Sequence, residues 1–323
     1  GCEAISMGPD MFEVHTPNEH LSISSVKNVY EYLLEVLKAM KSGVPIVDLD
    51  IFKRVQDLTP SEQVLNQISY TEDLYKEYYG MIMSLSSSLR SNYLQILKSE
   101  DIINNQVVEK ENSFLLALYY KTHPKNAMDE MIRCCNSEIT ASEFIKIHDK
   151  LLDGTSSEDQ KGLREDNLKF VGTYVAGQRQ IDYFPILEKD IVKALREYLS
   201  LINDKKRVQS KEDAFLKPII YHGLLAALQL FKDGNTRYAR LIQHINLWYY
   251  TNQTLGYDFS LPTVYATKQY AADRASYRGL IKSIAITEND DAWNNWIIYN
   301  LKCLQNNIWV NQSNIETLKR RKS

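Results

Sequence analysis

The chain has 323 residues, 44% of them hydrophobic, so it is long enough to close one large core or two smaller ones. Its 38 lysines and arginines nearly balance its 41 acidic residues, and the net charge of -3 excludes a general attraction to nucleic acid or to an anionic membrane. It has no apolar run of about 18 residues, the length that a membrane span needs. Gly1, Cys2 and Glu3 lack the basic and apolar segments of a signal peptide.

The four cysteines, at positions 2, 134, 135 and 303, have no metal-ligand spacing, and an adjacent pair such as Cys134 and Cys135 seldom forms a framework disulfide. We therefore expect reduced thiols in a cytoplasmic protein. A lipidated Cys2 is the alternative that the sequence leaves open.

Apolar side chains recur at helical spacing along almost the whole chain, and only 12 glycines and 8 prolines are available for tight turns. This pattern predicts an all-α fold. Turn-forming residues cluster between Pro45 and Pro60. We therefore expect an N-terminal helical arm over residues 1–59 and a main helical domain over residues 60–323.

One segment departs from the helical pattern. Two short runs with β-type composition, residues 169–175 and 178–183, flank Ala176 and Gly177 and predict a β-hairpin. A lone hairpin has exposed edges that can pair with an extended peptide. A plain connector between helices is the alternative interpretation.

The segment from Tyr221 to Ile242 carries the chemistry. An apolar helix is expected to end at a turn of Lys232, Asp233, Gly234 and Asn235, and a second helix to begin after it. The amides at a helix N-terminus lack intrahelical partners, and the helix dipole favours an anion there. Arg237 and Arg240, three residues apart, could bind separate phosphate oxygens. Asp233 could hold a divalent cation that bridges those oxygens.

This segment resembles the Fic motif, His-Pro-Phe-x-(Asp/Glu)-Gly-Asn-Gly-Arg-x-x-Arg. Six positions match in register: Phe231, Asp233, Gly234, Asn235, Arg237 and Arg240. Three differ, with Gln229 at the histidine, Leu230 at the proline and Thr236 at the second glycine. The resemblance extends to neighbouring segments, from about residue 60 onward: Asn112 to Leu118, Ile145 to Leu152, Gly162 to Arg164, Tyr183 to Pro185, Arg274 to Leu280, and Trp293 to Trp296.

The resemblance implies a mainly helical Fic fold with a short β-hairpin flap for target docking, built from Phe170, Val171, Gly172, Thr173, Tyr174 and Tyr183. It also implies binding of ATP, or another nucleotide, with Mg²⁺ through Asp233, Gly234, Asn235, Thr236, Arg237 and Arg240. In the family the motif histidine is the general base that lets a protein hydroxyl attack the α-phosphate. Gln229 can hydrogen-bond a hydroxyl but cannot accept its proton, and losing such a base costs about 10²–10⁴-fold in rate.

Two further histidines and one helix bear on this site. His222 lies two helical turns before Gln229, about 10 Å along the axis, and His244 lies a full turn past Arg240, so neither is expected to replace the base. Many family members carry an inhibitory helix with the pattern Ser-x-x-x-Glu-Gly. Ser86 to Ser91 resembles it, with Arg90 in the glutamate position. The sequence leaves two interpretations open: a regulatory role of Ser86 and Arg90 near Arg240, and an ordinary serine-rich helix start.

We therefore expect a nucleotide-binding protein of the protein adenylyltransferase (AMPylation) class in which AMP transfer to protein hydroxyls is weak or absent. A non-catalytic interaction module on the same fold is the alternative. Expected partners are a nucleotide and a protein that docks at the hairpin flap; a membrane and nucleic acid are not expected.

Overall fold

The computed structural model describes residues 43–109, 126–167, 169–175, 178–204 and 208–320, together with residues 11–12, 20–21, 26, 27, 29, 30 and 33. Its contacts divide the chain into two compact units, one formed by residues 1–46 and 168–184 and the other by residues 47–167 and 185–323. Most of the helical arm expected over residues 1–59, and the helix expected at Asn112 to Leu118, lie outside the described residues.

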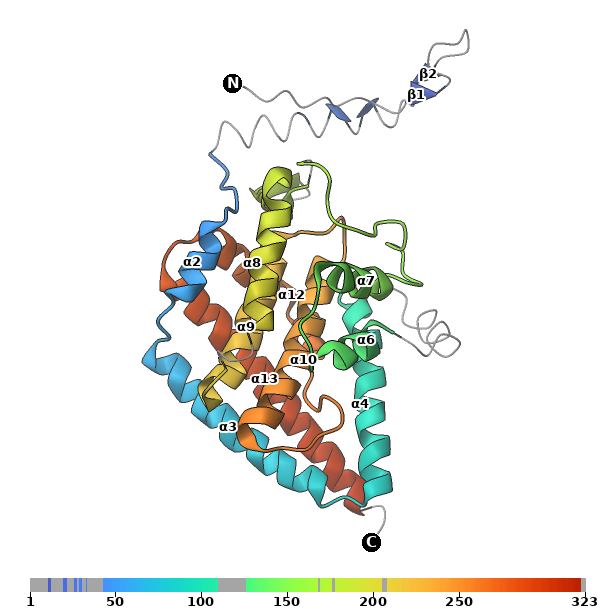
Figure 1. Ribbon diagram of the computed structural model, residues 1–323, viewed down its shortest axis with the longest axis vertical. Coiled ribbons are helices and arrows are strands. Elements are labelled where there is room, and N and C mark those ends of the chain that lie inside the picture. Colours follow the sequence, from blue (N-terminus) through green and yellow to red (C-terminus); the bar gives the residue numbers. More distant parts are fainter. Residues whose placement is uncertain are drawn as a thin grey trace. The chain divides into compact units, whose positions relative to one another are not determined.

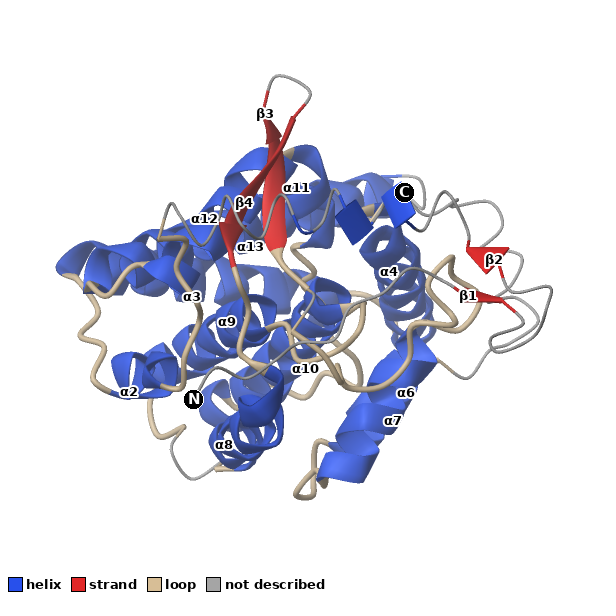
Figure 2. Ribbon diagram, turned by 90° about the horizontal axis from the view of Figure 1, so that it is seen from above, coloured by secondary structure: helices blue, strands red, loops and turns tan. Residues whose placement is uncertain are grey.

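The smaller unit contains two antiparallel pairs of strands. One pairs β1 (Met11–Phe12) with β2 (His20–Leu21), and the other pairs β3 (Val171–Val175) with β4 (Gln178–Tyr183). The second pair has a register shift between Val171 and Gly172. The predicted hairpin is thereby confirmed, and within the described part of the chain each of its strands pairs only with the other (Figure 2). Tyr183 is completely buried, so its ring, expected in the docking flap, is not offered to a target.

The larger unit is a bundle of helices (Figure 1). Its helices are α2 (Asp50–Gln56), α3 (Glu62–Met83), α4 (Ser87–Val107), α6 (Ala127–Cys134), α7 (Ala141–Leu151), α8 (Ile191–Asn203), α9 (Lys211–Leu228), α10 (Asn235–Leu255), α11 (Thr267–Ala272), α12 (Arg274–Ile286) and α13 (Asp290–Arg320). A 3₁₀ turn, Glu188–Asp190, precedes α8. The mainly helical fold with a short hairpin is therefore confirmed.

Polar side chains fix the starts of several of these helices. The hydroxyls of Ser61, Ser86 and Ser210 accept from the amides three residues further on, as does the amide oxygen of Asn126. Thr140 and Glu143 form a complete capping box at the start of α7. These caps satisfy amides that would otherwise lack partners in the first turn.

Helix α9 forms the centre of the unit and packs most extensively against α10. All of its residues from Pro218 to Leu228 are buried. At Gly223 a Cβ atom would lie 2.8 Å from both the Ile284 Cδ1 and the Trp296 Nε1, so glycine lets α9 approach α12 and α13 closely. This packing fixes the end of α9, where the candidate site begins. No helix in the described part of the chain is long and apolar enough to cross a membrane.

Candidate functional site

The candidate site is the turn between α9 and α10. The first helix ends at Leu228 and the second begins at Asn235, which confirms the two helices expected around this turn. Gln229 and Gly234 both have left-handed backbones, with φ of 51° and 74°, and Gln229 is the one non-glycine residue with positive φ among those described. The left-handed Gln229 ends α9, so Leu230 lies beyond the end of the helix.

Side chains beneath the turn hold its shape. The side-chain amide of Asn235 accepts from the backbone N–H of Phe231 at Oδ1 and donates from Nδ2 to the Phe231 carbonyl, each at 2.9 Å. His148 on α7 stacks on the Phe231 ring at 3.7 Å and donates from Nε2 to the Asp233 carbonyl at 2.8 Å. A Cβ atom at Gly234 would lie 2.8 Å from the Leu152 Cδ2, so Leu152 would have to shift, and the left-handed backbone also favours glycine here.

The segment from Gly162 to Arg164 supports the other side of the turn. Leu163 forms an antiparallel bridge with Phe231, and the Arg164 amide donates to the Leu230 carbonyl at 3.0 Å. The Arg164 guanidinium donates to the carbonyls of Gln229, Asp166 and Ile186. Arg164 therefore holds the backbone of Gln229 in its left-handed conformation.

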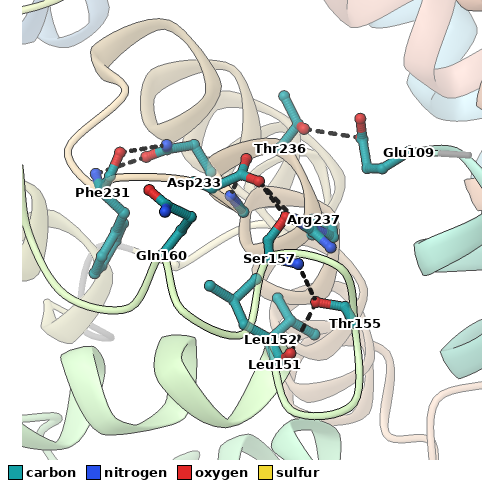
Figure 3. A network of polar contacts seen from close by, with 12 residues as sticks. Glu109, Leu151, Leu152, Thr155, Ser157, Gln160, Phe231, Asp233, Thr236 and Arg237 are labelled. Carbon is teal, nitrogen blue, oxygen red and sulfur yellow. Dashed lines mark hydrogen bonds and ion pairs between the residues drawn. The ribbon is translucent and has the colours of Figure 1, made fainter. Parts of the chain in front are cut away.

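Arg237, on the first turn of α10, is buried with 2% of its surface exposed, and Figure 3 shows it beside Ser157 and Asp233. Its guanidinium donates to the Gln106 Oε1, to the Ser157 hydroxyl and to the Asp233 carboxylate, each at 3.0 Å. The Ser157 hydroxyl in turn donates to the same Asp233 carboxylate. Asp233 remains 47% exposed, so it stays accessible from solvent.

Arg240, one turn further along α10, is completely buried. Its Nε donates to the side-chain oxygen of Asn105 at 2.6 Å, and its Nη2 donates to the Asn105 backbone carbonyl at 2.9 Å. Nη2 also donates to the Glu109 carboxylate at 2.9 Å. The same Glu109 oxygen accepts from the Thr236 hydroxyl at 3.0 Å. Glu109 therefore bonds two residues of the first turns of α10, on the element that the sequence assigned to phosphate binding. Figure 3 shows its bond to Thr236.

Electrostatics favours the ionised form of Glu109. Burial alone would raise the pKa of its carboxyl, but the charge and hydrogen bond of Arg240 and the hydrogen bond of Thr236 outweigh it and lower the pKa. The carboxylate and the guanidinium thus form a largely buried ion pair, since only 24% of the Glu109 side chain is exposed.

The placement expected of Arg90 near Arg240 is wrong. Ser86 caps the start of α4 and Arg90 lies in its first turn, where its guanidinium contacts the Met83 sulfur. Asn105, which contacts Arg240, lies fifteen residues further along the chain, about 22 Å along the helix axis. The residue that faces Arg240 is Glu109, just beyond the opposite end of α4.

Neither His222 nor His244 takes the place of a base at position 229. The Gln229 side chain turns back and donates to the Ala226 carbonyl at 2.7 Å. His222 is completely buried, bonded to Gln243 and Tyr277, and burial lowers its pKa well below the ordinary value. His244 is also buried, with Nδ1 facing Asp101 and Nε2 accepting from the Ala266 amide. Both histidines are core residues.

Sequence reasoning missed several contributors, among them Glu109, Ser157 and His148. Asn105 and Glu109 have the same four-residue spacing as Ser86 and Arg90, but asparagine stands at the serine position of the inhibitory pattern and Lys110 at its glycine position, so the match is hard to find in the sequence. Ser157 has no local signal, because it lies in a loop and meets Asp233 and Arg237 only through the fold.

Known proteins similar to this chain are found by a family model and among solved structures. Residues 138–247 match the family model described as Fic/DOC family, so the chain carries a Fic/DOC family domain over that span. Among solved structures, a variant of Fic-1 from C. elegans has a TM-score of 0.55 at 15% identity over 78% of this chain and 72% of its own. A Fic family protein from Desulfovibrio desulfuricans G20 has a TM-score of 0.55 at 14% identity, over 79% and 76% of the two chains. Among curated proteins, no significant match is found.

Proposed function

We propose that the Fic/DOC domain of this chain binds ATP, or another nucleotide, at the turn between α9 and α10, and that its AMP transfer to protein hydroxyls is weak or absent. The observation that carries the proposal is the convergence of Gly234, Arg237 and Arg240 at the start of one helix. Gly234 supplies no side chain to cap the first turn of α10, so an anion can take that role.

The residues present fit a Mg²⁺ ion bound together with a nucleotide. Mg²⁺ is commonly held by one or two carboxylates plus phosphate oxygens. Asp233 is a partly exposed carboxylate beside the start of α10. No cluster of three or more potential His, Cys, Asp or Glu ligands occurs among the described residues, so Asp233 would hold the ion with the help of the phosphates. When bound, the ion would neutralise phosphate charge.

In the structure both arginines are bonded to protein carboxylates. Asp233 pairs with Arg237, and Glu109 pairs with Arg240. A phosphate oxygen can bond the Arg240 guanidinium at Nη2 only if Glu109 withdraws. We therefore propose that the structure represents a closed form in which nucleotide binding competes with Glu109.

Weak transfer follows from the chemistry at position 229. The amide of Gln229 cannot remove a proton from a hydroxyl, and its side chain is bonded to its own helix end. The hairpin of β3 and β4 is the surface proposed for a protein target, because within the described part of the chain each strand pairs only with the other, and an extended peptide can add to such a sheet edge. The alternative, an interaction module without transfer, keeps this docking surface and gives the nucleotide only a regulatory role.

Calorimetry with ATP and Mg²⁺ tests the proposed site. We expect Arg237→Ala to weaken binding by about 1.5–3 kcal/mol, the range for hydrogen bonds to charged groups. Arg133→Ala is the matched control, because that guanidinium is 74% exposed and pairs with Glu130 on α6. Equal ATP affinity of Arg237→Ala and the wild type would remove the basis for the site.

A further inference from the structure

The guanidinium of Arg240 has one contact that does not depend on the segment carrying Glu109. Three of its hydrogen bonds go to Asn105 and Glu109, at the end of α4 and just after it. The fourth goes from Nη1 to the hydroxyl of Tyr277 on α12, at 3.4 Å. The guanidinium carbon also lies 5.9 Å from the centre of the Tyr277 ring, within cation–π range.

The direction of the hydrogen bonds beyond Tyr277 is fixed by chemistry. A guanidinium has no acceptor, so the Tyr277 hydroxyl accepts from Arg240 and gives its own proton to another group. That group is the Nε2 of His222, at 2.8 Å. A neutral imidazole that accepts at Nε2 carries its proton on Nδ1, which donates to the Gln243 side-chain oxygen.

The surroundings hold this relay rigidly. His222 and Tyr277 are buried, and His222 packs edge-on against Trp296 at 4.9 Å. The Tyr277 ring stacks on Tyr270 at 4.7 Å, and the Tyr270 hydroxyl bonds Gln243 at 3.1 Å. Burial also keeps His222 uncharged, which preserves the acceptor at Nε2. Neither ring can turn without breaking hydrogen bonds in a closely packed interior.

We propose that Tyr277 and His222 are positioning residues, which keep the Arg240 guanidinium in one orientation when Glu109 withdraws and a phosphate oxygen takes its place. This inference rests on the proposed nucleotide site and adds residues outside the motif to it. The two residues act through Arg240 and do not themselves touch the nucleotide.

The first test removes one hydroxyl. Tyr277→Phe keeps the ring, its stacking and its cation–π face, but loses the acceptor for Arg240. We expect its affinity for ATP with Mg²⁺, measured by calorimetry, to fall by about threefold to tenfold, as for one lost hydrogen bond. Tyr198→Phe is the matched control, because it deletes a buried hydroxyl that bonds the Tyr221 carbonyl on α9. We expect similar thermal destabilisation in both variants but unchanged ATP affinity in Tyr198→Phe.

The second test follows the relay through His222. In His222→Gln the longer amide can present an acceptor near the position of Nε2, whereas in His222→Asn the shorter amide cannot reach the Tyr277 hydroxyl. We expect ATP affinity close to that of the wild type in His222→Gln and a loss like that of Tyr277→Phe in His222→Asn. Equal losses in the two variants would overturn the role of His222.

A third measurement needs no ligand. The side-chain NMR signals of Arg240, assigned from their loss in Arg240→Lys, report how fast its guanidinium rotates and exchanges protons. We expect faster rotation in Tyr277→Phe than in Tyr198→Phe, and equal rates would overturn the proposal. If neither the wild type nor Glu109→Gln binds ATP, the proposed function fails, and the NMR comparison still decides whether the relay orients Arg240.

Discussion

Replacing Glu109 by glutamine should change stability and ATP affinity in opposite directions. The substitution keeps the shape of the side chain and its hydrogen-bonding oxygen but removes its charge. At 2.9 Å from Arg240, the Coulomb attraction at an effective dielectric constant of about 20 is on the order of 6 kcal/mol. Desolvation offsets much of this attraction, and a charge-assisted bond is about twice as strong as a neutral one. We therefore expect a loss of about 1–2 kcal/mol of unfolding free energy.

The same 1–2 kcal/mol should appear as a gain in ATP affinity. If nucleotide binding requires Glu109 to withdraw, then weakening its bonds raises the population of the open form and improves the apparent affinity by about 5- to 30-fold. Calorimetry with ATP and Mg²⁺ measures the gain, and thermal unfolding should show a Tm about 2–5 °C lower. A variant that loses stability without binding ATP more tightly would refute the competition between Glu109 and phosphate.

Glu72→Gln is the control for this experiment. Glu72 pairs with Lys211 at 2.7 Å, but the lysine side chain is 56% exposed. Exposed ion pairs contribute little to stability, so this variant should change stability little. Its ATP affinity should equal that of the wild type.

Two further predictions concern the same site. Because Arg240 lowers the pKa of Glu109 in the folded chain, the stability that this carboxylate contributes should be present above its ordinary pKa of 4.5 and be lost as the pH falls through the lowered value. Urea unfolding of the wild type and Glu109→Gln between about pH 3 and 7 checks this, and a difference that does not shrink in acid would contradict it. Gly234→Ala should be more destabilising than Gly256→Ala in thermal unfolding: both positions have positive φ, but only at Gly234 would the Cβ meet a neighbour, Leu152 at 2.8 Å. The strained backbone alone costs about 1–2 kcal/mol, so equal losses would show that the contact with Leu152 is unimportant.

Local sequence pattern was enough to predict the helices around the turn, whereas the hairpin depended on the family resemblance, because the β-type runs alone left a plain connector open. The apolar spacing of α9 and α10 and the glycine between them act over a few residues, and the structure follows them. The end of α9 was harder to predict, because Gln229 adopts a left-handed backbone that glutamine seldom takes. Arg164, 65 residues away, bonds the Gln229 carbonyl and helps to hold that conformation.

The environment of the two arginines could not be predicted from the motif. The pattern around Arg237 and Arg240 suggests side chains that are accessible to an anion, yet both are buried and bonded to protein carboxylates. The partner of Arg240 lies 131 residues away, and such a contact follows only from the packing of α4 against α10. For the same reason the sequence placed the regulatory contact at Arg90, although the geometry supports Glu109.

If the chain has a nucleotide site and lacks only a general base, a histidine at position 229 should restore transfer. The most direct measurement incubates the wild type, Gln229→His and the double variant Gln229→His with Leu230→Pro with labelled ATP and Mg²⁺, then counts label on protein. The double variant is included because the motif has proline at position 230. The Leu230 amide donates no hydrogen bond among the described residues, so proline removes none. We expect label on the variant itself or on lysate proteins to rise at least a hundredfold over the wild type, within the range of about 10²–10⁴-fold for general-base catalysis. A double variant that binds ATP but transfers no label would contradict the claim and favour the interaction module.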